Sequence, residues 1–345
     1  EVIMAALIPS FLYYLAVFVQ ADLEAAKNGI AALPKDRIPP MMRVMKEGWF
    51  FVVPYVVLIY TLFWMNMAPQ QAAFWAAVSV GVVSIIFGYK KLRITPKQFI
   101  ATFSGCGRMS VDIIIIGAMA GVIIGILDKT GLGQALTLIL AAIGENNLWL
   151  LLILTAIISI LLGMGMPTSA IYLLLATMIA PSLIKLGVNP ISAHLFVLYF
   201  GLMSMITPPV AIAAFAAASL AGAKPMETGM TAVRLGWIAY IIPFVFVLSP
   251  NLLMQGEAVQ VLTALVLACI GVWIASCGFI GYLFRPIGAA FRLLFVAAGL
   301  ALLVPGDAFT YGVAINVTGG ILAFLLIGRE YMARRNGAVA SPIQS

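Results

Sequence analysis

The sequence has little charge. Asp, Glu, Lys and Arg make up 9% of its 345 residues, whereas hydrophobic residues make up 63%. Soluble globular domains carry about 25% charged residues, so this composition excludes a soluble enzyme and a disordered protein. A membrane β-barrel needs short segments of alternating polarity, and uninterrupted apolar stretches such as residues 148–162 do not alternate. The sequence therefore predicts an all-α polytopic membrane protein.

Side chains that carry catalysis are also scarce. The chain has one histidine, and its three cysteines (Cys106, Cys269 and Cys277) lack metal-ligand spacing and read as packing residues. It shows no Gly-rich phosphate loop, nucleophile elbow or paired catalytic carboxylates, so we expect no enzyme activity. The net charge of +7 comes from Lys and Arg in short loops between apolar runs. That pattern indicates membrane topology, and no nucleic-acid partner is expected.

Apolar runs close to the ~20 residues of a membrane-crossing helix define the expected spans. They are residues 3–20, 49–66, 70–88, 110–127, 228–249, 258–283, 287–304 and 310–327. Cytoplasmic loops collect Lys and Arg. One topology places all 19 basic residues except Lys129 and Lys185 on the cytoplasmic side.

Two interruptions fall in the dense apolar region after residue 131. Residues 148–186 hold two apolar runs that meet at Gly163–Thr168. They predict either a re-entrant hairpin whose tip lies at membrane depth or two full crossings with a turn at the surface. Residues 190–222 are interrupted by Thr207-Pro208-Pro209. Because proline has no N–H, we expect carbonyls around residues 203–205 to lose their helical partners, unless a kink capped by Ser204 and Thr207 satisfies them.

Both interruptions offer neutral oxygens and no carboxylate. Ca²⁺ and Mg²⁺ normally require carboxylates and transition metals require Cys, His or acidic groups, so the pattern favours Na⁺ held by freed carbonyls and hydroxyls. The predicted Na⁺ residues are Gly163, Gly165, Met166, Thr168, Ser204, Thr207 and Pro208. Pro167, Ser169 and Pro209 are predicted to lie near the substrate. His194 is a further candidate for that position, although a hydrogen-bonded packing role is the favoured interpretation for it.

An ordered set of motifs carries a family resemblance. It comprises Gly163-Met164-Gly165-Met166-Pro167-Thr168-Ser169-Ala170, Gly187-Val188-Asn189-Pro190, Ala193-His194 and Ile206-Thr207-Pro208-Pro209-Val210-Ala211. These stretches resemble the large permease subunit of tripartite ATP-independent periplasmic (TRAP) transporters, in particular the fused branch paired with TAXI-type binding proteins. The resemblance implies an elevator-type transporter of two inverted repeats in the bacterial cytoplasmic (inner) membrane. It also implies Na⁺-driven import of small carboxylates, a periplasmic substrate-binding protein and a small membrane subunit fused upstream.

The same resemblance divides the chain as a C-terminal fragment with an incomplete first repeat. Residues 1–20 would be the last helix of that repeat, residues 21–48 a cytoplasmic connector, residues 49–109 scaffold helices and an arm, residues 110–253 the second repeat with its hairpin (148–186) and broken helix (190–222), and residues 254–345 a membrane extension. A binding-protein-independent Na⁺/anion symporter of similar fold is the alternative function. A channel or an intramembrane enzyme is a further alternative from a different class.

Overall fold

The computed structural model describes residues 1–30, 37–87, 147–166 and 168–335, together with residue 34 and scattered positions between 95 and 142. The residues described are helical or lie in turns, and none of them belongs to a β-strand, which confirms the predicted all-α class. Six helical segments in this part of the chain are long and apolar enough to cross a membrane. They are Val2–Lys27, Met41–Phe63, Thr168–Lys185, Pro225–Leu248, Ala258–Ile280 and Gly312–Arg335.

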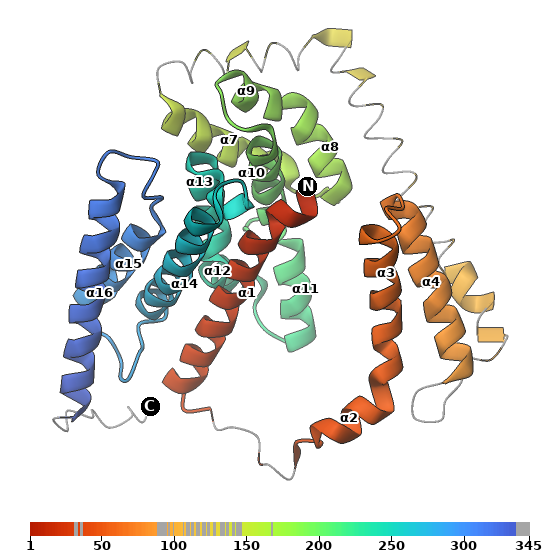
Figure 1. Cartoon of the computed structure of the whole chain (residues 1–345), viewed down its shortest axis with the longest axis horizontal. Helices are drawn as coiled ribbons and strands as arrows, with labels where there is room; N and C mark the ends of the chain where they lie inside the picture. Colours follow the sequence, from red (N-terminus) through yellow and green to blue (C-terminus); the bar gives the residue numbers. More distant parts are fainter. Residues whose placement is uncertain are drawn as a thin grey trace. The chain divides into compact units, whose positions relative to one another are not determined.

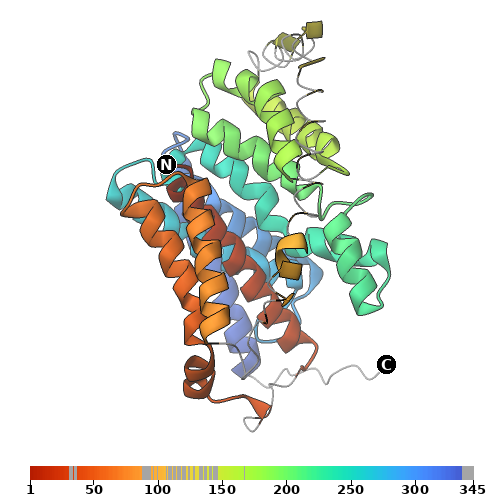
Figure 2. The ribbon, with the colours of Figure 1, turned by 90° about the vertical axis from the view of Figure 1, so that its right-hand side faces the viewer.

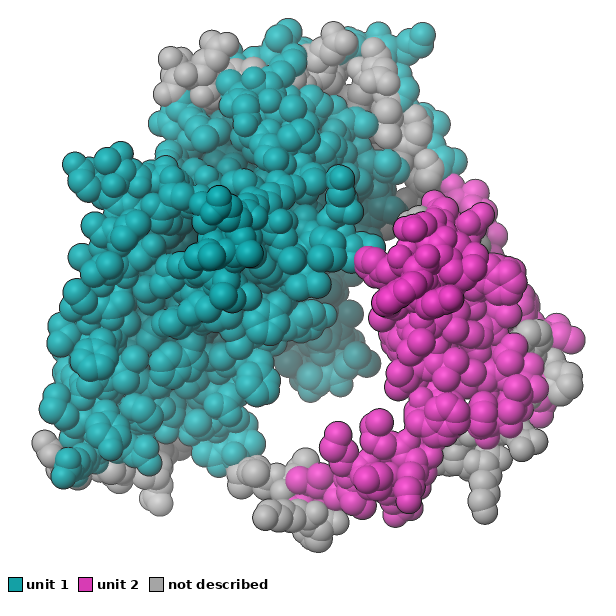
Figure 3. Space-filling model, viewed as in Figure 1, with its two compact units in different colours: residues 1–30, 116–345 teal, residues 31–115 magenta. Residues whose placement is uncertain are grey.

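The chain divides into two compact units, which Figure 3 colours separately. The smaller one, residues 31–115, contains α2 (Met41–Gly48), the 3₁₀ turn Trp49–Val52, α3 (Val53–Phe63) and α4 (Pro69–Ile86). Helices α3 and α4 run side by side (Figures 1 and 2). The buried ring of Phe50 stacks on Phe87 at 5.7 Å, which ties the start of α3 to the end of α4.

The larger unit, residues 1–30 and 116–345, carries all the predicted site residues. Its helices, in chain order, are α1 (Val2–Lys27), α7 (Leu148–Gly163), α8 (Thr168–Met178), α9 (Ala180–Lys185), α10 (Pro190–Met203), α11 (Ile212–Ala221), α12 (Pro225–Leu235), α13 (Trp237–Leu248), α14 (Ala258–Ile280), α15 (Ala289–Leu303) and α16 (Gly312–Arg335). A 3₁₀ turn at Pro250–Leu253 joins α13 to α14.

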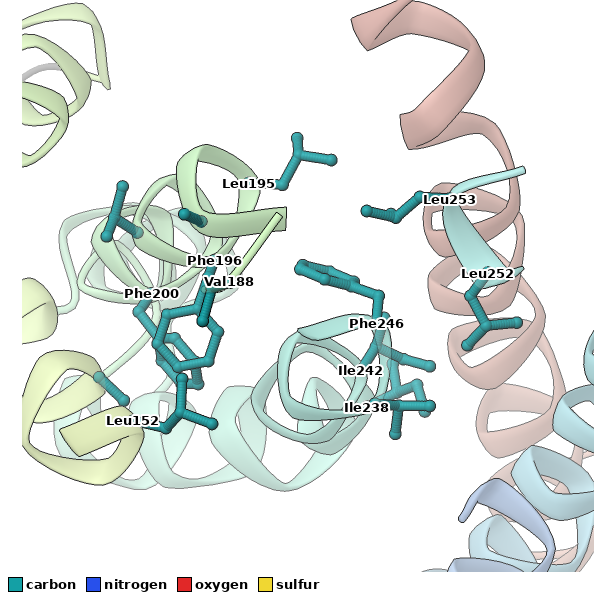
Figure 4. Close-up of a cluster of buried hydrophobic side chains, with 14 of the residues drawn as sticks. Leu152, Val188, Leu195, Phe196, Phe200, Ile238, Ile242, Phe246, Leu252 and Leu253 are labelled. Atoms are coloured by element: carbon teal, nitrogen blue, oxygen red, sulfur yellow. The ribbon is translucent and has the colours of Figure 1, made fainter. Parts of the chain in front are cut away.

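Helix α10 packs against α7, α8 and α13. Its start is set locally, because Pro190 suits the first helical position and Asn189 Oδ1 accepts from the backbone N–H of Ile191 at 2.9 Å. The core is mainly aromatic and aliphatic (Figure 4). Its labelled members come from α7, α10, α13 and the turns beside them: Leu152, Val188, Leu195, Phe196, Phe200, Ile238, Ile242, Phe246, Leu252 and Leu253.

Two helices extend beyond their expected spans. Helix α1 continues to Lys27 instead of ending near residue 20, and its last side chain donates from Nζ to Ile280 O at 3.0 Å. Helix α16 continues to Arg335 instead of residue 327, where Glu330 pairs with Arg285. A helix can continue past the edge of the hydrocarbon, because long charged side chains cover apolar surface and still reach water. The apolar runs in the sequence therefore predicted the apolar part of each helix and not its full length.

The expected span at 228–249 corresponds to the apolar segment Pro225–Leu248, which is long enough to cross a membrane. It consists of two helices, α12 and α13, which meet at Gly236. A Cβ built at Gly236 would lie 2.9 Å from Ile206 Cδ1, so the glycine lets this junction lie close to the segment after α10. Most of the expected span at 110–127 lies outside the described residues. In the predicted arm, residues 95–108, only residues 96, 99, 106 and 108 lie outside them, and the described residues from 97 to 107 are helical.

Basic residues of the larger unit converge on one end of its helices. Lys27 reaches the last carbonyl of α14, Arg292 donates to Gly278 O at 3.1 Å, and Arg234 lies 3.5 Å from Glu24. The loops at the opposite ends, residues 249–257 and 304–311, contain no Lys or Arg. This asymmetry agrees with the topology expected from the charge pattern.

Candidate functional site

The first interruption separates α7 from α8. Helix α7 ends at Gly163, Met164 adopts an extended backbone and Gly165 has φ = +80°. A left-handed conformation costs other residues about 1–2 kcal/mol, which explains a glycine at this turn. Helix α8 begins at Thr168. Pro167, predicted to lie near the substrate, falls outside the described residues.

The second interruption separates α10 from α11 over residues 204–211. The expectation that the carbonyls of residues 203–205 lose their helical partners holds for residues 204 and 205 and is wrong for Met203. Met203 O accepts from the N–H of Thr207 at 2.9 Å, and Met205 O accepts from the N–H of Ala213 at 3.0 Å. The chain folds back after the prolines and supplies the missing donor, which spacing alone could not reveal. Within the part of the chain described, Ser204 O alone among these three accepts no hydrogen bond.

The two interruptions touch each other at Ser204. Its hydroxyl oxygen lies 2.9 Å from Gly163 O, at the end of α7, and 2.7 Å from Gly201 O, in the last turn of α10. Ser204 is buried. A serine hydroxyl has one hydrogen, so it cannot satisfy both carbonyls fully. Gly163 O also accepts from the backbone N–H of Met166 at 3.4 Å, and Gly201 O from that of Ser204 at 3.3 Å. Three neutral oxygens therefore meet at this point, and only long backbone hydrogen bonds supplement the hydroxyl proton.

Two glycines make this approach possible. A Cβ on Gly163 would lie 2.6 Å from Gly201 O, and a Cβ on Gly201 would lie 2.5 Å from Ile171 Cγ2 of α8. Gly201 therefore fits between both arms of the hairpin. The adjacent face of α7 is also narrow and polar, because Thr155 and Ser159 are fully buried there. Small residues at an interface let membrane helices approach closely.

A second hydroxyl pair lies one turn farther along the chain. Thr207 Oγ1 donates to Met203 O and lies 2.7 Å from the hydroxyl of Tyr240, which belongs to α13. Neither Tyr240 nor Gly201 was expected from the sequence. A tyrosine inside an apolar run reads as an interfacial anchor, and only the packing of α13 shows that its hydroxyl meets the second interruption.

The other predicted residues are less closely assembled. Gly165, Thr168 and Ser169 are exposed at the hairpin turn, Met166 is half-buried there, and Pro209 is exposed after α10. Pro208 lies against α12, where a Cβ on Gly229 would meet its Cγ at 3.0 Å.

His194 lies apart from these residues. Its Nδ1 is 3.2 Å from the hydroxyl of Tyr172 on α8. His194 precedes Ser204 by ten residues, which corresponds to about 15 Å along a helix. The contact joins α8 to α10, and it does not reach the interruptions.

The chemistry of the junction is that of neutral oxygen ligands. No Asp or Glu occurs between residues 148 and 222, and the described residues include no group of three or more His, Cys, Asp or Glu that could hold a metal. Carbonyls and hydroxyls without a net charge suit a monovalent hard cation better than a divalent one. The hydroxyl oxygen of Ser204 lies within contact distance of the carbonyl oxygens of Gly163 and Gly201 at this junction.

Comparisons with known proteins find similar chains among transporter permeases. The chain is 23% identical over 252 residues to the C4-dicarboxylate TRAP transporter large permease protein of Pseudomonas aeruginosa, covering 72% of this chain and 57% of that protein. It is 24% identical over 254 residues to the sialic acid TRAP transporter large permease protein of Vibrio cholerae, covering 71% and 56%. It is 23% identical over 226 residues to the isethionate TRAP transporter permease protein of Oleidesulfovibrio alaskensis, covering 65% and 35%.

The chain thus spans just over half the length of the first two relatives and about a third of the last one. These relatives are named as transporter permeases and not as enzymes. No solved structure matches the chain. The model of the family described as "Tripartite ATP-independent periplasmic transporter, DctM component" matches residues 1–261. Together with the six apolar helices, this match shows that the chain is a multi-pass inner-membrane protein and belongs to the family of TRAP transporter large permease proteins.

Proposed function

We propose that the chain is the permease component of a Na⁺-coupled secondary transporter that imports small organic acids. In this proposal a periplasmic binding protein delivers the substrate and a small membrane subunit completes the transporter. The named relatives act on C4-dicarboxylates, sialic acid and isethionate, which supports a small organic anion as the substrate class. A permease that fuses two components is also among the relatives by name.

The observation that carries the Na⁺ proposal is the junction at Ser204. Its hydroxyl lies within 2.9 Å of two backbone carbonyls that come from different interrupted helices. Each carbonyl also accepts from one backbone N–H, at 3.3–3.4 Å, which is longer than a typical hydrogen bond. An alkali ion would add coordination that these weak donors leave open, without requiring a carboxylate. The oxygens would adjust around the ion, with Thr207 and the exposed Thr168 as further ligands.

We further infer that the hairpin and α10 move together, as an elevator mechanism requires. Helix α10 packs against both α7 and α8, and Gly163 and Gly201 make close contacts in the interface between α10 and these two helices. A cation held between Gly163 and Ser204 would couple ion occupancy to the contact between the hairpin and α10. A ligand shifts such an equilibrium only by its different affinity for the two arrangements.

The test is uptake of substrate into liposomes by the complete transporter with its binding protein, measured with and without an inward Na⁺ gradient. The Ser204→Ala variant should raise the Na⁺ concentration that gives half-maximal uptake by about tenfold, since a hydrogen bond or ligand of this kind is worth about 1–1.5 kcal/mol. The matched control is Ser182→Ala. Ser182 is also buried, but its hydroxyl donates to Ile179 O within its own segment, so its Na⁺ response should not change.

The double variant with Thr168→Val and Thr207→Val should lose Na⁺ dependence in the same assay. If Ser204→Ala and the double variant both respond to Na⁺ as the unmodified transporter does, the Na⁺ site lies elsewhere. Uptake that persists without the binding protein would instead identify the alternative, a binding-protein-independent Na⁺/anion symporter.

A further inference from the structure

A long apolar cavity lies in the three-helix extension formed by α14, α15 and α16. Its volume is about 700 Å³, and most of it lies beyond residue 261, where the family match ends. Helix α15 packs against both α14 and α16. The walls come from α14 between Val259 and Ile274 and from α16 between Val313 and Ile327. At 1.5 Å per residue the cavity runs about 22 Å along α14.

The cavity is a long groove, since it has a volume of about 700 Å³ and follows α14 for about 22 Å. Its walls reach the surface of the chain, because Val259 and Phe324 are 74% and 77% exposed. Alkyl chains are thin and flexible, and an open apolar groove of this length suits them.

Polar side chains form the mouth of the cavity, and their donor hydrogens already take part in hydrogen bonds within the protein. Asp307 Oδ2 accepts from Ser249 Oγ at 2.8 Å and from Asn251 Nδ2 at 3.0 Å. Asn316 Nδ2 donates to Ala301 O at 2.9 Å and to Val304 O at 2.8 Å. What remains is mainly acceptors: the second oxygen of Asp307 and the side-chain oxygen of Asn316 accept none of the hydrogen bonds found among the described residues.

The free groups at the mouth of the cavity are acceptors and include a carboxylate, so they favour a cation that donates several hydrogen bonds. A primary ammonium has three such donors, whereas a phosphate or a glycerol head group without an amine brings no positive charge to Asp307. The mouth lies at the end of the helices opposite the basic cluster, and its loops, residues 249–257 and 304–311, contain no Lys or Arg that would compete for the carboxylate. The charge pattern assigns this end to the outer face.

We propose that this cavity binds one phospholipid of the outer leaflet whose head group carries a primary ammonium. The ammonium pairs with Asp307 and the side-chain oxygen of Asn316, and the acyl chains lie along α14 and α16. The proposal does not depend on the Na⁺ site, which lies on α7 and α10.

The test is native mass spectrometry of the complete transporter with two lipids of equal acyl chains, phosphatidylethanolamine and phosphatidylglycerol. We expect phosphatidylethanolamine to be retained about two- to fivefold more, the range that exposed ion pairs produce. Phosphatidylcholine, which keeps the positive charge but has no N–H, should fall to the lower level. Asp307→Asn should remove the preference. The control Glu257→Gln changes a carboxylate at the same end that does not line the cavity, and it should keep the preference.

A steric pair of variants tests the acyl groove. Gly320 lines the cavity and has only Leu302 Cδ2, at 3.9 Å, near its Cβ position, whereas Gly328 does not line the cavity and has nothing within 4 Å. Gly320→Phe should lower retention of all three lipids and Gly328→Phe should not. Equal retention of the three lipids by the unmodified protein would overturn the proposal. So would a Gly320→Phe variant that changes self-association and leaves lipid retention unaltered, because the occupant would then be a second copy of the chain.

Discussion

The contact between Gly163 and Gly201 is tested by replacing Gly163 with alanine. The added Cβ would lie 2.6 Å from Gly201 O and 2.9 Å from Ser204 Oγ, whereas carbon–oxygen contacts settle at about 3.3–3.6 Å. The hairpin tip and α10 must therefore separate by about 0.7–1 Å. Overpacking of this kind costs about 1–3 kcal/mol.

The same separation should weaken ion binding, because it pulls Gly163 O away from Ser204. A loss of about 1–3 kcal/mol corresponds to about a five- to 150-fold change in affinity. Two measurements check this result: the midpoint of thermal unfolding of the purified transporter, with and without Na⁺, and the Na⁺ concentration for half-maximal uptake. We expect the unfolding midpoint to fall and the stabilisation by Na⁺ to shrink.

The control is Gly328→Ala, since Gly328 lies inside α16 with nothing within 4 Å of its Cβ position. Alanine in a helix interior is favoured over glycine by about 1 kcal/mol, so this variant should be as stable as the unmodified protein or more so. If Gly163→Ala keeps both the unfolding midpoint and the Na⁺ response, the close approach of the two interruptions does not hold the ion, and the reasoning fails.

Three further predictions follow from single contacts. Tyr240→Phe removes the hydroxyl beside Thr207 and should raise the half-maximal Na⁺ concentration about fivefold, as expected for about 1 kcal/mol. The control Tyr199→Phe changes a half-buried tyrosine whose ring packs on Phe246, and it should leave the half-maximal Na⁺ concentration unchanged. Equal effects in the two variants would show that the hydroxyl of Tyr240 has no specific role in the Na⁺ response. Glu330→Gln leaves two arginines facing a buried neutral group and should lower the stability of the protein by about 1–3 kcal/mol in thermal unfolding, less than a fully buried pair because one arginine is half exposed; an unchanged midpoint would contradict this. A cysteine at Thr168 should resist a membrane-impermeant reagent added from the cytoplasmic side, whereas one at Lys224 should react; rapid labelling at both positions would identify a surface turn instead of a re-entrant hairpin.

Much of the fold follows from the sequence because the membrane restricts the choices. Hydrocarbon offers no partner for backbone polar groups, so apolar runs must be helical, and the absence of charge marks them directly. The basic residues predict the orientation by a separate rule, because cytoplasmic loops collect Lys and Arg. The ends of α1 and α16 were misjudged because a helix can extend beyond the hydrocarbon, where Lys27 and Glu330 find partners on other helices.

The candidate site was predictable in its location and not in its composition. Proline lacks an N–H and glycine permits positive φ, so Gly165 and Pro208-Pro209 identified the interruptions from residue type alone. Which oxygens are free depended on how the chain folds back, because Ala213 supplies the donor that Met205 would otherwise lack. The sequence by itself determined an all-α membrane protein with two interrupted segments rich in neutral oxygens. Only the tertiary structure decided that Gly163, Gly201 and Ser204 meet and that Tyr240 joins Thr207, since contacts between helices depend on packing at distances that no local pattern encodes.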